Sequence, residues 1–185
     1  DRAERLGYTI VEPSPVLATH LTEVILTHAA DLLTRQHTQN LVDHVKETAA
    51  KVVEELVPSI LTLGEVQKVL QRLLRERVSV RNLETVLEVL ADFGPRTRDP
   101  ELLTEYARQA LARQICADYA DEDSVLRVVT LAPELEREIL DAVQRAEAGE
   151  YIPLSPERAE TIAQRTAEAV QPLVLAGQEP VVLTS

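Results

Sequence analysis

The chain has 185 residues, of which 45% are hydrophobic and 3% aromatic, so its core must consist of Leu, Val, Ile and Ala. This length suits one large domain or two small ones. The 31 acidic residues outnumber the 19 basic ones and give a net charge of −12, which argues against a general nucleic-acid binder and against adsorption to anionic membranes.

The first part of the chain predicts one short strand followed by helices. Tyr8–Val11 is a β-type run. Ser14 precedes a proline, an order typical of an N-cap and a first helical position, and predicts a helix over Pro15–Arg35. Further helices are predicted over about Thr38–Thr48 and over Ala49–Leu56.

Start and stop signals are clearest over residues 61–115, where three helices are predicted to pack into a compact subdomain. Thr62 and Glu65 form a T-x-x-E capping box. Asn82 is predicted to cap the second helix, and Gly94 to end it in a left-handed conformation. Asp99 followed by proline opens the third helix. The predicted buried face of that helix comprises Leu103, Tyr106, Ala107, Ala110 and Leu111.

Beyond the third helix the pattern changes from helical to mixed. Asp118–Ser124 is acidic and loop-like, and Val125–Leu131 predicts a strand. Helices are predicted over about Pro133–Ala148 and Ser155–Leu173, with a strand over Pro180–Ser185. The order strand, helix, helix, strand indicates an α/β unit. The predicted fold is therefore mainly α, with an all-helical subdomain followed by a small α/β subdomain.

The sequence predicts no catalytic residue, metal site or cofactor. His20, His28, His37 and His44 lie eight and seven apart in pairs, but no HExxH motif or close cysteine accompanies them, which favours ordinary polar histidines. Cys116 is the single cysteine and has no partner motif, so a partly buried structural thiol is favoured over a nucleophile. G-x-S-x-G and phosphate-cradling glycine motifs are absent, and adjacent carboxylates are interpreted as solvated surface.

One candidate surface is a basic stretch inside this acidic protein, with five cations against a single carboxylate, Glu76. It comprises Lys68, Arg72, Arg75, Arg77 and Arg81. A solvated helix face with local salt bridges is one interpretation. The other is a contact with an acidic partner or with the next subunit, and such head-to-tail contacts can close into a ring.

A second candidate surface comprises Val11, Val16 and Thr19. Val16 and Thr19 are three residues apart and share one face of the first predicted helix, and Val11 leads into it. Simple packing of the strand on the helix is the interpretation that these residues alone favour.

Two long runs resemble one family. They are GYTIVEPSPVLATHLTEVI (residues 7–25) and LTLGEVQKVLQRLLRERVSVRNLETVLEVLADFGPRTRDPELLTEYARQALARQI (residues 61–115). The chain resembles the cytoplasmic region of the flagellar/Hr/invasion protein export pore family, the export-gate subunits of type III secretion, and is most similar to the flagellar members. This resemblance implies that residues 1–30 are the last piece of the first cytoplasmic subdomain, residues 31–115 the all-helical third, and residues 116–185 the start of the α/β fourth. We therefore expect a fragment of a longer membrane protein.

The resemblance also implies a function without catalysis. Val11, Val16 and Thr19 match a cleft that receives export chaperones with their substrates, and the basic stretch Lys68–Arg81 lies in a subdomain at the subunit contacts of a nonameric ring. The implied partners are chaperone–substrate complexes, other export-apparatus proteins and further copies of the chain, on the cytoplasmic side of the bacterial inner membrane. The membrane is reached only through an absent N-terminal region, and neither nucleic acid nor a cofactor is implied. The alternatives are a helical adaptor unrelated to secretion and, third, an enzyme.

Overall fold

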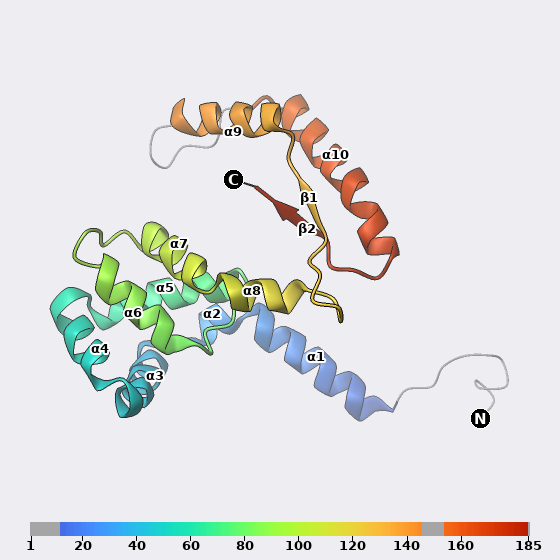
Figure 1. The fold of residues 1–185 in the computed structure, drawn as a ribbon. Coiled ribbons are helices and arrows are strands. Elements are labelled where there is room, and N and C mark those ends of the chain that lie inside the picture. The colour runs from blue at the N-terminus through green and yellow to red at the C-terminus, as the bar shows by residue number, and fades with distance from the viewer. Residues whose placement is uncertain (1–11, 146–153, 185) are drawn as a thin grey trace. The chain divides into compact units, whose positions relative to one another are not determined.

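The computed structural model describes residues 12–145 and 154–184, and the chain divides into two compact units, Asp1–Arg113 and Gln114–Ser185 (Figure 1). The described part is mainly helical, with one parallel pair of strands in the second unit, which confirms the predicted fold class. The predicted strand Tyr8–Val11 lies outside the described residues. So does Gly149, which follows the helix predicted over about Pro133–Ala148.

The first unit is entirely helical where it is described. Its elements are α1 (Pro13–Thr27), α2 (Ala29–Leu32), α3 (Arg35–Thr48), α4 (Ala50–Glu55), η2 (Leu56–Ile60), α5 (Leu63–Arg75), α6 (Leu83–Phe93) and α7 (Pro100–Ala110). Helix α8 (Ala112–Tyr119) contains the boundary between the units. The sequence did not predict α8 as a separate helix, and none of its residues is buried.

The single helix predicted over Pro15–Arg35 is wrong at its start and at its end. It begins two residues earlier, with Pro13 at the first helical position, and Ser14 therefore lies inside the helix. The chain leaves helical geometry at His28 and again before Thr34, whose hydroxyl accepts a hydrogen bond from the His37 amide at 3.2 Å and caps α3.

The core of the first unit consists of aliphatic side chains from α3 to α7. The fully buried large residues are Leu56, Leu61, Leu70, Leu73, Leu87, Leu90, Leu103, Leu111, Val42, Val66, Val69 and Val86. Phe93 stacks on Tyr106 with ring centroids 4.1 Å apart where α6 meets α7. Within α7, Thr104 is buried although it was not predicted to be, and its hydroxyl donates to the Pro100 carbonyl; Ala110, predicted to be buried, is exposed.

Within residues 61–115, helix starts follow the predicted side-chain chemistry at two of three positions. Thr62 and Glu65 form the predicted capping box at α5, and Asp99 accepts a hydrogen bond from the Glu101 amide at 2.9 Å at α7. Asn82 precedes α6 but makes no cap hydrogen bond, because its side-chain oxygen accepts from the Thr85 hydroxyl at 3.1 Å instead.

Glycine stands at position 94, directly after α6, for a steric reason that differs from the predicted one. Its φ of −55° and ψ of −35° are right-handed, so the left-handed conformation expected for it is wrong. A Cβ atom at this position would lie 2.5 Å from Ile60 Cγ2 and 2.6 Å from the Leu90 carbonyl oxygen. Glycine is therefore required by close packing of η2 against the end of α6.

The end of α5 places a charged residue in the left-handed region. Arg77 has a φ of 58°, its amide donates to the Leu74 carbonyl at 3.0 Å, and the Val78 amide donates to the Leu73 carbonyl at 2.9 Å. These two bonds are the pattern with which helices commonly end, usually at a glycine. The connector to α6 then continues without helix or strand as far as Asn82.

The second unit has the predicted order of strand, helix, helix and strand. Its elements are β1 (Val128–Thr130), α9 (Pro133–Arg145), α10 (Pro156–Leu175) and β2 (Val181–Leu183), and the strands pair in parallel with Val128 opposite Val181. Both strands are shorter than predicted, and the acidic loop begins only after α8. The Ser155 hydroxyl accepts a hydrogen bond from the Arg158 amide and caps α10, and Gly177 follows α10 with a φ of 71°.

Candidate functional site

Helix α1 brings two of the three predicted docking residues together. Val16 and Thr19 line a shallow hollow of about 460 Å³, and Pro15, His20 and Glu23 complete its lining. We call these five residues the docking surface. Val11, the third predicted residue, lies outside the described residues.

The docking surface belongs to a helix that buries nothing within the described structure. No residue of α1 is buried, and the exposed fraction is 53% for Val16, 67% for Leu17 and 59% for Leu21. A helix with large apolar residues on more than one face is typical of a helix covered by other protein. Helix α1 therefore offers the largest run of exposed apolar side chains on any described helix of the first unit.

One end of the docking surface is joined to α5 by an ion pair. The Arg77 guanidinium donates to a Glu23 carboxylate oxygen at 2.6 Å and to the Thr27 hydroxyl at 3.3 Å. The hydrogen bond and the charge of Arg77 hold the pKa of the Glu23 carboxyl below its usual value. Neither Glu23 nor His20 was a predicted docking residue. For Glu23 the reason is that its partner, Arg77, lies 54 positions away in the sequence and leaves no local pattern.

The predicted basic stretch does not form one continuous patch. Lys68, Arg72 and Arg75 are spaced by four and three residues on α5, so they share one face. Arg72 pairs with Glu101 of α7, and Arg77 turns toward α1. The local salt bridges of the first interpretation are thus present at these two arginines, and a contact between subunits stays a prediction.

Three cations of the stretch remain available to a partner. Among the described residues, the exposed side chains of Lys68, Arg75 and Arg81 make no hydrogen bond and no ion pair. Arg81 and Val80 lie between two apolar-lined hollows of about 300 and 360 Å³, and line both of them. The first is formed with the ends of α1 and α5, and the second with α3 and the start of α6.

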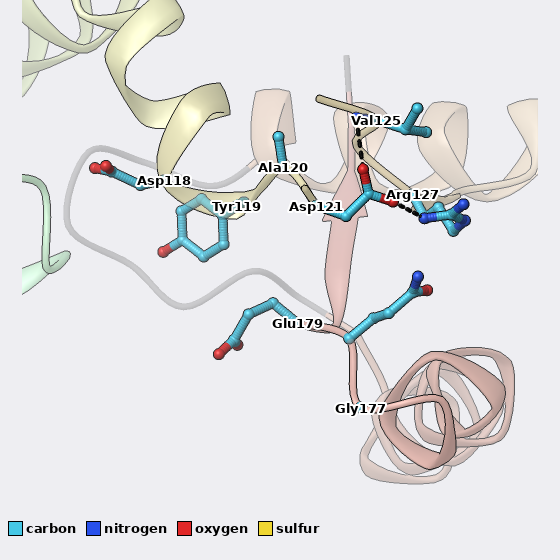
Figure 2. A pocket seen from close by; sticks show the side chains of 9 residues that line it. Asp118, Tyr119, Ala120, Asp121, Val125, Arg127, Gly177 and Glu179 are labelled. Atoms are coloured by element: carbon cyan, nitrogen blue, oxygen red, sulfur yellow. Dashed lines mark hydrogen bonds and ion pairs between the residues drawn. The ribbon is translucent and has the colours of Figure 1, made fainter. Parts of the chain in front are cut away.

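The second unit carries a small polar hollow of about 190 Å³ beside its acidic loop (Figure 2). Asp121 organises this loop, because its carboxylate accepts hydrogen bonds from the Val125 amide at 2.9 Å and from Arg127. The bond from the Val125 amide is the first cause, and Arg127 the second, of a pKa of Asp121 below its usual value. The Asp121 carboxylate therefore has a structural role, unlike the solvated neighbours predicted with it.

The four histidines and the single cysteine are exposed in the described structure. Across residues 12–145 and 154–184, no three His, Cys, Asp or Glu side chains are grouped so that they could hold a metal ion. The His37 ring contacts the Leu32 carbonyl oxygen at 2.9 Å, and His28 and His44 each lie near a single carboxylate. Cys116 is exposed, so the predicted partly buried thiol is wrong; it lies on α8, which buries no residue.

The fold is similar to those of solved structures. The described fold is similar to a chain in the structure of the Chlamydia pneumoniae CdsV and CdsO protein complex, with a TM-score of 0.84 and 27% identity over 99% of this chain and 54% of that one. It is also similar to the nonameric EscV cytosolic domain from the type III secretion system, with a TM-score of 0.70 and 30% identity over 82% of this chain and 45% of that one. The fold is thus of the class found in these type III secretion proteins.

The sequence comparisons give the family. The chain belongs to the FHIPEP family, which matches residues 1–185 and confirms the family resemblance. It is 48% identical to the flagellar biosynthesis protein FlhA of Bacillus subtilis (strain 168) over all of its own length and 27% of that relative. The chain therefore spans about a quarter of that curated relative and about half of the solved chains. No described helix has the length and apolar character needed to cross a membrane.

Proposed function

We propose that this chain is a non-enzymatic part of a flagellar type III export gate, on the cytoplasmic side of the inner membrane. In this proposal the docking surface on α1 receives export chaperones with their substrates, and the cations of α5 and its connector contribute to a ring of identical subunits. Family membership and the 48% identity to a flagellar biosynthesis protein support the setting. The nonameric assembly of a similar cytosolic domain supports the ring.

The observation that carries the docking role is the exposure of α1. Its large apolar side chains include Val16, Leu17 and Leu21, each more than half exposed, and a hollow lies between Val16 and Glu23. Contact with a partner would remove these side chains from water, at about 25 cal/mol for each Å² buried. His20 and Glu23 at the rim would add polar selectivity to this apolar contact.

Thr19→Asp tests docking at the docking surface. It places a carboxylate in the hollow, which a partner could cover only by desolvating that charge. We expect the affinity of the complete cytoplasmic region for a flagellar export chaperone bound to its substrate to fall at least tenfold, measured by calorimetry. Ala18→Asp adds the same charge to the same helix outside the hollow, and is the matched control. Equal affinities of the two variants would refute the assignment.

Assembly is tested with the two arginines that make no ion pair among the described residues. Reversing Arg72 would also remove the partner of Glu101 and disturb the first unit, so Arg75→Glu with Arg81→Glu is the sharper variant. Since opposite charges orient subunit contacts, we expect this variant to weaken self-association of the complete cytoplasmic region in light scattering. Arg113→Glu with Arg137→Glu changes the net charge equally at exposed sites on the helices α8 and α9. The proposal fails if both double variants associate to the same extent.

A further inference from the structure

Helix α1 is attached to the first unit by few contacts. It buries no residue, and the chain leaves helical geometry directly after it, at His28 with φ of −105° and ψ of 13°. Between α1 and the rest of the described first unit, the side-chain hydrogen bonds and the ion pair are those of Arg77 with Glu23 and Thr27. In Figure 1, α1 continues the chain away from the bundle formed by α3 to α7.

The other side of this contact is held firmly. The backbone of Arg77 is fixed in the left-handed region by the two hydrogen bonds that end α5. The preceding residue, Glu76, accepts two hydrogen bonds from Arg108 of α7, at 2.6 and 2.9 Å. The guanidinium that meets α1 therefore extends from a backbone that is anchored to the bundle.

The apolar contact between α1 and the bundle leaves room for movement. Leu26 of α1 lines a hollow of about 300 Å³ together with Ala29 of α2, Leu74 and Val78, instead of a filled interface. Tightly packed side chains would fix the direction of a helix by themselves. Here the hollow is not filled, so the direction of α1 depends on the ion pair between Glu23 and Arg77 at its edge.

We propose that Glu23 and Arg77 form a latch that fixes the direction of α1 relative to α5, with His28 as the hinge. The latch therefore sets where the docking surface lies relative to the helical bundle, and this consequence rests on the proposed docking function. Both side chains are more than half exposed. Exposed ion pairs contribute little to stability, so a partner that offers Arg77 another carboxylate can open the latch without unfolding the unit.

The latch is tested by distances between spin labels on Ala18→Cys in α1 and Glu88→Cys in α6, in the whole chain with Cys116→Ser. Both label positions are exposed. We expect one narrow distance distribution for the otherwise unchanged protein and a broad one for Glu23→Gln and for Arg77→Gly. Arg77→Gly suits the left-handed backbone, so its broadening does not come from loss of the α5 end, and its melting temperature should not fall. Arg75→Gln, a neighbour without an ion pair to a described residue, is the control and should leave the distribution narrow.

Charge exchange completes the test. Glu23→Arg with Arg77→Glu restores opposite charges in reversed positions and should return the narrow distribution. The proposal is overturned if Glu23→Gln and Arg77→Gly keep the original distribution, or if the exchange leaves it broad. The measurement uses no chaperone, so its outcome is separate from that of Thr19→Asp: the latch can hold while docking fails, and the reverse.

Discussion

Gly94→Ala is a substitution that sequence and structure both predict to be destabilising, but for different physical reasons. A left-handed glycine would resist alanine because of its backbone, but Gly94 is right-handed, where alanine is normally preferred by about 0.4–1 kcal/mol. The added Cβ would instead lie 2.5 Å from Ile60 Cγ2 and 2.6 Å from the Leu90 carbonyl oxygen. That oxygen already accepts the Gly94 amide at 2.9 Å, so it cannot withdraw without loss of this bond.

Overpacking of this kind costs about 1–3 kcal/mol, which exceeds the backbone gain and leaves a net loss of about 1–2 kcal/mol. For a unit of this size, such a loss lowers the melting temperature by about 5–10 °C. Gly64→Ala is the matched control, because the atoms nearest to its Cβ would belong to the movable guanidinium of Arg35. Thermal unfolding followed by circular dichroism should show Gly64→Ala unchanged or stabilised and Gly94→Ala destabilised. Equal melting temperatures for the two variants would refute the steric explanation.

Other expected outcomes concern caps, the core and a turn. Thr62→Ala removes the N-cap of α5 and should cost about 1 kcal/mol in urea unfolding. Hydrogen bonds from the Thr62 amide and hydroxyl, with the nearby Arg98 and Lys68 charges, hold the pKa of Glu65 below its usual value. The Glu65 carboxylate therefore contributes stability that is present above its pKa in the unfolded chain. This stability is lost as the pH falls through the lower pKa of the folded state. Unfolding measured against pH should therefore vary less for Glu65→Gln. Leu73→Ala empties a fully buried site and should cost about 2–5 kcal/mol in the same assay. Gly177→Ala, at a φ of 71° with no atom near the new Cβ, should cost about 1 kcal/mol in the second unit, measured by local hydrogen exchange.

The elements predicted best are those specified by neighbours in the sequence. The capping box of Thr62 and Glu65 and the Asp99 cap involve residues two or three positions apart, and both are present as predicted. The apolar periodicity of α5 likewise places Val66 and Leu70 in the core. Such signals act within one turn of helix, so they need no partner that is distant in the sequence.

The elements predicted worst depend on distant residues. The break between α2 and α3 is stabilised by α5, because the side-chain amides of Gln67 and Gln71 donate to the Leu33 carbonyl at 2.8 and 3.1 Å. Nothing near Leu33 in the sequence reports these donors. The start of α1 is a local error of another kind: two prolines compete for the first helical position, and Pro13 takes it, although Ser14 and the proline after it give the stronger capping signal.

The same distinction applies to the candidate surfaces. Val16 and Thr19 were predicted to share a face, and they line one hollow because both lie on a single helix. The basic stretch was read as five equivalent charges, yet Arg72 and Arg77 are each engaged by a carboxylate that is distant in the sequence. A charge already paired within its own unit gains less from a partner, because the existing pair must be broken first. The cations left for an acidic neighbour are then Lys68, Arg75 and Arg81, while Arg77 acts inside the chain to direct the helix on which docking is proposed.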